Sequence, residues 1–347
     1  MKIKKLYAGL LAAVLAMTAL VSCGSESSSG ESSAAGSQPA ETVTVTDESS
    51  PDPQPAPAAD ASVKTAKVKE YISSVFGSQM LAGQMESTWK TSPDYEMNYI
   101  EKVTGKLPAI RGLDFMNNDF AGVVERAKAW DAKGGIVTIC WHTGVSGSGY
   151  QESKDEKPDF DKLLTEGTEE YNTLMKSWDE AAKALAELRD ANVPVLWRPF
   201  HEFDGKWFWW GKGGKENFIK LWQLMYDKFT NEYGLNNLIW VLGYSGYVYD
   251  DWYPGDEYVD IVGSDTYDNT TNKRAWEKLQ KITDKPRAFH ECGNVPPVEQ
   301  FEEDGDLWAW FMIWHTDYIM ANDRDNLKAV YNSDKIVTLD ELPDFNS

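Results

Sequence analysis

The stretch "LWRPFHEFDGKWFWWG", residues 196–211, runs from an apolar segment into His201 and Glu202 and then, after a short polar turn, into four consecutive aromatic residues. The apolar segment is typical of a buried strand, and the acid stands where that strand ends. Further apolar runs of similar length recur along the chain. We therefore expect eight strands, at residues 80–84, 107–114, 136–141, 193–200, 238–242, 259–264, 287–290 and 307–314.

Helix-like segments separate most of these runs. Apolar residues recur every three or four positions from Tyr171 to Leu188, and again from Phe218 to Phe229. Continuously apolar strands that alternate with helices indicate a parallel sheet covered by helices. Eight such units favour an α/β fold of the (β/α)8 TIM-barrel type. An open doubly wound sheet usually carries a Gly-rich phosphate turn after its first strand, and "LAGQME" lacks that pattern.

Polar residues follow most of the predicted strands. In a barrel of this type the working surface is the rim at the C-terminal ends of the strands. The rim would hold Gln84, Glu86, Asp114, His142, His201, Glu202, Asp265, Tyr267, His290, Glu291, Trp314 and His315. All four histidines of the chain lie at strand exits, which would be an unusual distribution for scattered structural residues. The rim is therefore a predicted site.

Glu202 and Glu291 each follow a histidine at the end of an apolar strand. A single glutamate in such a place is usually solvated or caps a helix, but two glutamates at one rim indicate a catalytic pair. Glycoside hydrolysis uses such a pair, because one carboxylic acid donates a proton and the other carboxylate attacks or activates water. At least one of the four aromatics at 207–210 should face the cleft, where an indole ring can pack on a pyranose, and one or two should be core residues.

Arg198 lies four residues before Glu202 and, on an alternating strand, would point the same way as the acid. A guanidinium inside a barrel needs a carboxylate partner, either at the site or in a structural ion pair. Tyr267 is a candidate hydrogen-bond donor to the carboxylate that stays charged. The long polar loop 143–167 is expected to wall one side of the cleft or to remain a solvated loop.

The N-terminal region predicts export. Residues 1–22 read as a signal peptide, and "LVSC" resembles a bacterial lipobox, which implies cleavage before Cys23 and lipidation of its sulfur; an ordinary secretory signal is the alternative. Residues 23–62 have the composition of a disordered Ser, Pro and acidic linker. Residues 63–347 would form one catalytic domain. We expect an extracellular protein that is lipid-anchored to the bacterial cell membrane.

The formal net charge of −21 argues against nucleic acid and anionic membrane surfaces as ligands, and favours a neutral ligand. The lipid anchor would be the chain's membrane contact, and a tethered barrel is expected to be a monomer. Cys140 and Cys292 should be free buried thiols. A metal-dependent hydrolase is a weaker alternative, because no His-x-His or His-x-x-x-His pattern occurs; we expect no metal and no cofactor.

The segments "MLAGQ", "GGIVTICWH", "VPVLWRPFHE", "WFWWG", "VDIVGSDTY", "FHECG" and "AWFMIWH" resemble glycoside hydrolase family 26, whose commonest members are bacterial β-mannanases. The resemblance covers essentially the whole globular part. It implies that Glu202 is the general acid/base and Glu291 the nucleophile of a retaining mechanism, with the carboxylates ~5–5.5 Å apart. It also implies sugar-binding or supporting roles for His142, Arg198, His201, Trp207, Tyr267 and Trp314.

The same resemblance implies an endo-acting β-1,4-mannanase that hydrolyses mannan, glucomannan or galactomannan by double displacement. Two alternatives remain open within the family, a mixed-linkage β-glucanase and a β-1,3-xylanase. A third alternative is a catalytically silent, lipid-anchored protein that binds carbohydrate. The presence of both Glu202 and Glu291 speaks against the silent form.

Overall fold

The computed structural model describes residues 60–347 of the chain. The predicted signal peptide, Cys23 and nearly all of the predicted linker lie outside the described residues. The first helix, α1 (Ala61–Val75), begins two residues before the predicted domain start at 63, and the Asp60 side chain caps it by accepting a hydrogen bond from the backbone N–H of Ser62. Among the helices of residues 60–347, none has both the length and the apolar character of a membrane span.

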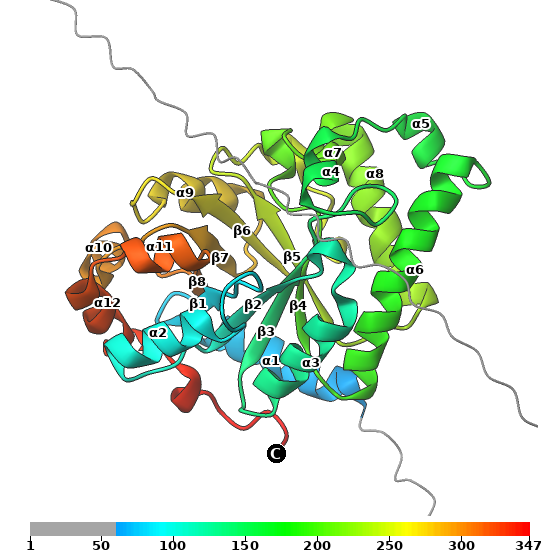
Figure 1. The fold of residues 1–347 in the computed structure, drawn as a ribbon. Coiled ribbons are helices and arrows are strands. Elements are labelled where there is room, and N and C mark those ends of the chain that lie inside the picture. The colour runs from blue at the N-terminus through cyan, green and yellow to red at the C-terminus, as the bar shows by residue number, and fades with distance from the viewer. Residues whose placement is uncertain (1–59) are drawn as a thin grey trace, which may run out of the picture. The chain divides into compact units, whose positions relative to one another are not determined.

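The described residues form a nine-stranded sheet whose main part is a closed parallel barrel (Figure 1). The strands are β1 (Met80–Met85), β2 (Ile110–Asp114), β3 (Ile136–Cys140), β4 (Val195–Arg198), β5 (Leu238–Tyr244), β6 (Ile261–Thr266), β7 (Arg287–Cys292), β8 (Trp310–Ile313) and β9 (Ile336–Val337). Strands β1 to β8 pair in sequence order, and β1 pairs with both β8 and β2, which closes the ring. The two-residue strand β9 adds to the start of β1. The predicted (β/α)8 TIM barrel is confirmed.

Helices surround this barrel and connect its strands (Figure 1). After α1 they are α2 (Tyr95–Thr104), α3 (Phe120–Asp131), α4 (Tyr150–Asp155), α5 (Phe160–Leu163), α6 (Glu169–Asp190), α7 (Trp209–Lys212), α8 (Lys215–Tyr226), α9 (Lys273–Ile282), α10 (Val298–Asp304), α11 (Thr316–Ala321) and α12 (Arg324–Tyr331). The loop predicted at 143–167 contains α4 and α5, so it is more ordered than its polar composition suggests.

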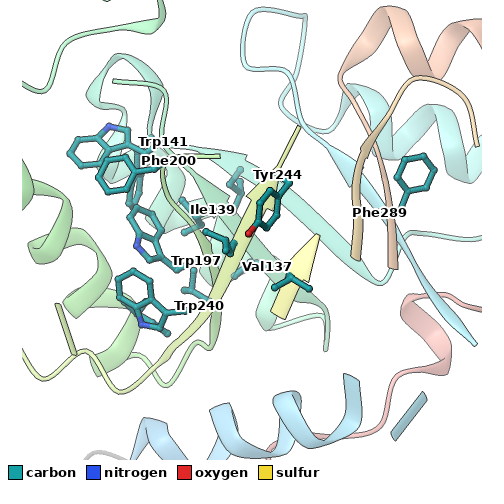
Figure 2. Packing of buried hydrophobic residues seen from close by; sticks show 14 of the residues in the cluster. Val137, Ile139, Trp141, Trp197, Phe200, Trp240, Tyr244 and Phe289 are labelled. Carbon is teal, nitrogen blue, oxygen red and sulfur yellow. The ribbon is translucent and has the colours of Figure 1, made fainter. Parts of the chain in front are cut away.

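Strand alternation divides the apolar core into two layers. In β3, Val137 and Ile139 point outward and pack with Trp197 and Trp240 in the layer between sheet and helices (Figure 2). Ile136 and other inward-facing residues fill the barrel, together with apolar residues of α1. The regular twofold alternation of parallel strands produces both layers, and it therefore also decides which side chains can reach the barrel mouth.

Strand β7 breaks this alternation. Gly263 of β6 pairs with Ala288 and Asp265 pairs with Glu291, so β7 advances three residues while β6 advances two. The pairing with β8 shows the same offset between Phe289 and Cys292. A β-bulge of one extra residue explains both registers. Phe289 and Cys292 lie in the outer apolar layer. The two residues between them both turn inward, where His290 contacts Asp265 and Glu291 contacts Arg198.

Strand β4 is shorter than predicted. It ends at Arg198, and both Phe200 (φ 51°) and Glu202 (φ 52°) adopt the left-handed conformation. A non-glycine residue in this region is strained, and such strain is frequent at functional sites. The backbone N–H of Glu202 is held by the carbonyl of Gly243 at 2.6 Å. The acid therefore leaves the barrel on a tight turn and not on an extended strand.

Candidate active site

A cavity of about 820 Å³ opens at the C-terminal ends of the strands. It is lined by side chains from the exits of most strands, among them Glu86, Trp89, Asp114, His142, Tyr150, His201, Glu202, Phe208, Tyr267, Glu291, Trp314, His315 and Tyr318. Charged groups and aromatic rings thus share one cleft. The predicted location of the site at the barrel rim agrees with this cavity.

Glu202 and Glu291 face each other across the cleft. A carboxylate oxygen of Glu202 and one of Glu291 lie within 4.8 Å of each other, and an oxygen of Asp265 lies within the same distance of both. Glu202 is positioned by the left-handed turn after β4, and Glu291 by the bulge of β7. Two local departures from regular strand geometry therefore bring the two acids together.

Glu202 is adapted to carry a proton. Burial raises its pKa from 4.5 to about 7, and the negative charge of Glu291 acts in the same direction. The indole N–H of Trp207 donates to Oε2 of Glu202 at 2.8 Å and opposes the shift. The carboxyl is consequently protonated in a large share of molecules near neutral pH, which suits a general acid.

Glu291 is held by two donors. Nη2 of Arg198 donates to Oε1 at 2.6 Å, and the hydroxyl of Tyr267 donates to Oε2 at 2.5 Å. Both hydrogen bonds stabilise the carboxylate form. Burial, assisted by the charge of Glu291, raises the pKa of Tyr267, so this phenol keeps the proton that it donates. The two acids therefore occupy different environments: Glu202 is buried next to a negative charge, whereas Glu291 accepts hydrogen bonds from a guanidinium and a phenol.

Strand alternation predicted that Arg198 points the same way as Glu202, and both side chains do approach Glu291. The guanidinium of Arg198 contacts Glu291 and, at 3.4 Å, Oδ2 of Asp265. The prediction assumed an extended strand as far as Glu202, whereas β4 ends at Arg198 and the chain then turns. The expectation that the buried guanidinium is paired with a carboxylate at the site is confirmed.

His142 and His201 form a hydrogen-bonded pair at the floor of the cleft. Nδ1 of His142 lies 2.5 Å from Oδ2 of Asp114, and its Nε2 lies 3.1 Å from Nε2 of His201. Burial and the neighbouring charge of Arg198 lower the pKa of His201 far below its ordinary value, so this imidazole is neutral. Asp114 thereby fixes the orientation of both rings, and the sequence placed Asp114 at the rim without assigning it this contact.

The four aromatics after Glu202 divide unequally. Trp207 is 36% exposed beside the acid, whereas Phe208, Trp209 and Trp210 are buried. Three of the four belong to the core, not the expected one or two, although Phe208 also lines the cavity. Trp314, after β8, is half-buried and lies over the guanidinium of Arg198, with 6.0 Å from Cζ to the ring centroid.

Two groups of side chains have the spacing of metal ligands, Asp114–Cys140–His142 and Glu202–Asp265–Glu291. In the first group, burial raises the pKa of the Cys140 thiol, which disfavours the thiolate that binds metals. In the second, Arg198 and Tyr267 already donate to the carboxylates. The protonated thiol in the first group and the donors in the second make both groups poor metal sites. Cys140 and Cys292 are free and buried, as predicted.

A sequence model of glycosyl hydrolase family 26 matches residues 58–341. The chain belongs to this family. Among curated relatives, a mannan endo-1,4-beta-mannosidase of Thermothelomyces thermophilus is 35% identical over 82% of this chain and 62% of the relative. Mannan endo-1,4-beta-mannosidase B of Piromyces sp is 30% identical over 81% of this chain and 52% of the relative. The chain therefore spans about half to three fifths of the length of these relatives.

Solved structures agree with the family 26 assignment. GH26A of a Muricauda species has a TM-score of 0.76 at 35% identity, over 82% of this chain and 99% of that one. A β-mannanase from a symbiotic protist of the termite Reticulitermes speratus, complexed with a gluco-manno-oligosaccharide, has a TM-score of 0.74 at 32% identity, over 84% of this chain and 96% of that one. The family 26 resemblance predicted from sequence is confirmed.

The structure of this family 26 domain brings together all eight predicted site residues that lie within its described part. It also adds three aromatics that sequence reasoning missed, Trp89, Tyr150 and Tyr318, which line the cavity. Trp89 is 54% exposed and packs edge-on against His315, with ring centroids 4.9 Å apart. The position of Trp89 shortly after the first strand could have indicated a cleft residue, because the loops at that end of the strands contribute to the cleft.

Proposed function

We propose that this family 26 chain is a retaining, endo-acting β-1,4-mannanase. The observation that carries the proposal is the close pair of glutamates with different environments, Glu202 with a pKa of about 7 and Glu291 bound by Arg198 and Tyr267. The relatives named as mannan endo-1,4-beta-mannosidases support mannan as the substrate.

In the first step, a carboxylate oxygen of Glu291 attacks the anomeric carbon of a mannosyl unit, while Glu202 donates its proton to the departing glycosidic oxygen. The bond to the leaving sugar breaks and a glycosyl ester forms on Glu291. In the second step, ionised Glu202 removes a proton from water, and the water oxygen attacks the same carbon and releases Glu291. Two inversions leave the configuration unchanged.

The separation of the acids supports this route. Inverting glycosidases place the two carboxyl groups ~6.5–9.5 Å apart to admit a water molecule, and retaining ones ~5–5.5 Å apart. One carboxylate oxygen of Glu202 and one of Glu291 lie within 4.8 Å of each other, which fits the retaining spacing. The gap suits one glycosidic linkage.

Sugar binding is proposed for the groups that surround the acids. Trp314 would form a platform under the sugar at the cleavage point, and Trp207 would contact the leaving-group side next to Glu202. His142 and His201 would bind hydroxyl groups of the same sugar.

A substrate panel tests the specificity. Mannan, glucomannan, lichenan and β-1,3-xylan are incubated with the enzyme, and the products are sized. Short oligomers from glucomannan and mannan are expected. Preferred cleavage of lichenan or β-1,3-xylan would replace the mannanase assignment by one of the two family alternatives.

The silent carbohydrate-binding alternative is tested with Glu202→Ala. Reducing-sugar release from mannan by the wild type, lost in the variant, supports an enzyme. The same blank value for both proteins would favour a binding protein. The structure favours the enzyme, because Glu202 and Glu291 retain the donors that their chemical roles need.

Export and anchoring remain proposals for residues 1–62. We propose cleavage before Cys23, lipidation of its sulfur and a flexible tether that holds a monomeric barrel outside the cell membrane. Replacement of Cys23 by Ser should release the protein from the membrane fraction of an expressing bacterium. Retention of the variant in that fraction would contradict the lipid anchor.

A further inference from the structure

His290 is a buried histidine that the double displacement does not use. Its side chain is 2% exposed, and it precedes Glu291 in the bulge of β7. Without the bulge, alternation would turn Glu291 outward when His290 faces inward. The extra residue allows both side chains to enter the barrel mouth, so His290 is built into the same local feature that positions Glu291.

Two glycines make room for the imidazole. A Cβ atom on Gly243 of β5 would lie 2.7 Å from Cε1 of His290, and one on Gly263 of β6 would lie 2.4 Å from Cδ2. Both distances are too short for any side chain at these positions. The neighbouring strands β5 and β6 therefore carry no side chain next to His290, and the imidazole ring occupies the space that their glycines leave.

From that position His290 reaches Asp265. Its Nδ1 hydrogen-bonds Oδ1 of Asp265, whose side chain is fully buried. The other oxygen of Asp265 meets Arg198 at 3.4 Å, while Arg198 donates to Glu291 at 2.6 Å. Two buried carboxylates thus share one guanidinium, and the shorter contact belongs to Glu291.

Burial and the charge of Glu291 raise the pKa of Asp265, and Arg198 opposes this shift. The ionised form of Asp265 therefore depends on compensation by its donors, and the imidazole N–H supplies part of it. If that N–H were removed, Oδ1 of Asp265 would have no donor. Asp265 would then compete more strongly for Arg198 and draw the guanidinium away from Glu291. We propose that His290 is a positioning residue, which holds Asp265 so that Arg198 remains on Glu291. The inference rests on the proposed role of Glu291 as nucleophile.

The surroundings keep His290 neutral. Burial and the charge of Arg198 lower the pKa of His290, so the imidazole is neutral, and a proton on Nδ1 is the tautomer that its contact with the Asp265 carboxylate requires. The titratable and charged groups near the Asp265–His290 pair are Arg198, His201, Glu202 and Asp204 from β4 and its exit, Tyr267 after β6, and Glu291 and Cys292 from β7. Arg198 is the cation of this set. The environment of Glu291 therefore depends on whether the guanidinium binds Glu291 or Asp265 more closely.

The test compares His290→Leu with His290→Asn. The two new side chains have the same branched skeleton of four heavy atoms, but only asparagine places an N–H donor near the position of Nδ1. On the glycan that the wild type cleaves, His290→Leu should lower kcat about 10- to 100-fold, the equivalent of one hydrogen bond to a charged group, with little change in KM. The acid limb of its pH profile should move to higher pH. His290→Asn should keep most of kcat and the wild-type acid limb.

A second readout does not depend on turnover. In protein labelled with ¹³C at the glutamate carboxyl carbon, the Glu291 signal, assigned with Glu291→Gln, is titrated in both variants. The midpoint should be higher in His290→Leu than in His290→Asn. If the Leu variant fails to fold, His290→Met, which fills the space without a donor, replaces it.

Equal kcat, acid limb and carboxyl midpoint in the two variants would overturn the role of His290. A wild type that cleaves none of the four glycans would instead contradict the proposed function. In that case the carboxyl titration still decides whether His290 controls the environment of Glu291.

Discussion

At the scale of single residues, the site works by giving two chemically identical side chains different surroundings. Glu202 is partly buried next to a negative charge, whereas Glu291 accepts from a guanidinium and a phenol. The residue types and their order were readable from sequence. Their hydrogen bonds were not, because each connects segments far apart in the chain, such as Arg198 and Glu291.

Trp207 should tune the pH profile through Glu202. Its indole N–H lowers the pKa of the acid, so Trp207→Phe, which keeps an aromatic ring, should raise that pKa. The general acid would then stay protonated to higher pH, and the basic limb of kcat/KM would move upward. Trp89→Phe is the matched control, because Trp89 lines the same cavity without a hydrogen bond to Glu202. An unchanged basic limb in Trp207→Phe would contradict the assignment of that limb to Glu202.

Glu202 should also cost stability at neutral and alkaline pH. Its pKa is about 7 in the folded state against 4.5 as its ordinary value, so folding binds a proton between these values and this group destabilises the fold as the pH rises through them. Glu202→Gln should increase the free energy of unfolding at pH 8 by up to about 3 kcal/mol, less the effect of partial exposure, and hardly change it at pH 4.

Denaturant unfolding at the two pH values measures this effect. Glu303→Gln, at an exposed acid, serves as the control and should show no pH-dependent gain. A gain for Glu202→Gln that is equal at pH 4 and pH 8 would mean that packing, not the charge of the carboxylate, limits stability at this position.

At the scale of elements, the strand exits determine the site. The apolar runs predicted all eight barrel strands, because buried parallel strands are continuously apolar. They did not predict that β4 ends at Arg198 or that β7 carries a bulge. The early end of β4 and the bulge of β7 both depend on contacts with neighbouring strands, such as the hydrogen bond from the Glu202 N–H to the Gly243 carbonyl. Such contacts do not change the pattern of apolar residues, so the sequence does not reveal them.

The two glycines around His290 should respond differently to substitution. In Gly263→Ala the new Cβ would lie 2.5 Å from the backbone oxygen of Ala288 and 2.4 Å from His290, whereas in Gly243→Ala it would mainly meet the His290 ring. Each change should lower the free energy of unfolding by about 1–3 kcal/mol or more through overpacking.

Adding His290→Ala separates the two cases. It should relieve most of the cost of Gly243→Ala but little of the cost of Gly263→Ala, because the backbone clash persists. Chemical denaturation of the single and double variants measures the coupling. Equal relief in both pairs would contradict the described position of the imidazole.

At the scale of the whole molecule, the barrel formed by residues 60–347 carries the acid-lined cleft at the end where its parallel strands exit. The sequence predicted this architecture, the location of the cleft and its two acids. It missed Trp89, Tyr150 and Tyr318, because the position of a loop residue over a cleft depends on how the loop folds back. A strongly acidic protein with an aromatic cleft suits a neutral polymer, which agrees with the names of its family 26 relatives.

The central claim is that Glu202 and Glu291 act as a retaining pair on a β-mannosidic bond. The most direct measurement follows the anomeric protons of the products by ¹H NMR during the first minutes of hydrolysis of a mannooligosaccharide, before mutarotation. The account predicts that the β-anomer of the new reducing end appears first and the α-anomer later. First appearance of the α-anomer would show inversion and contradict the account.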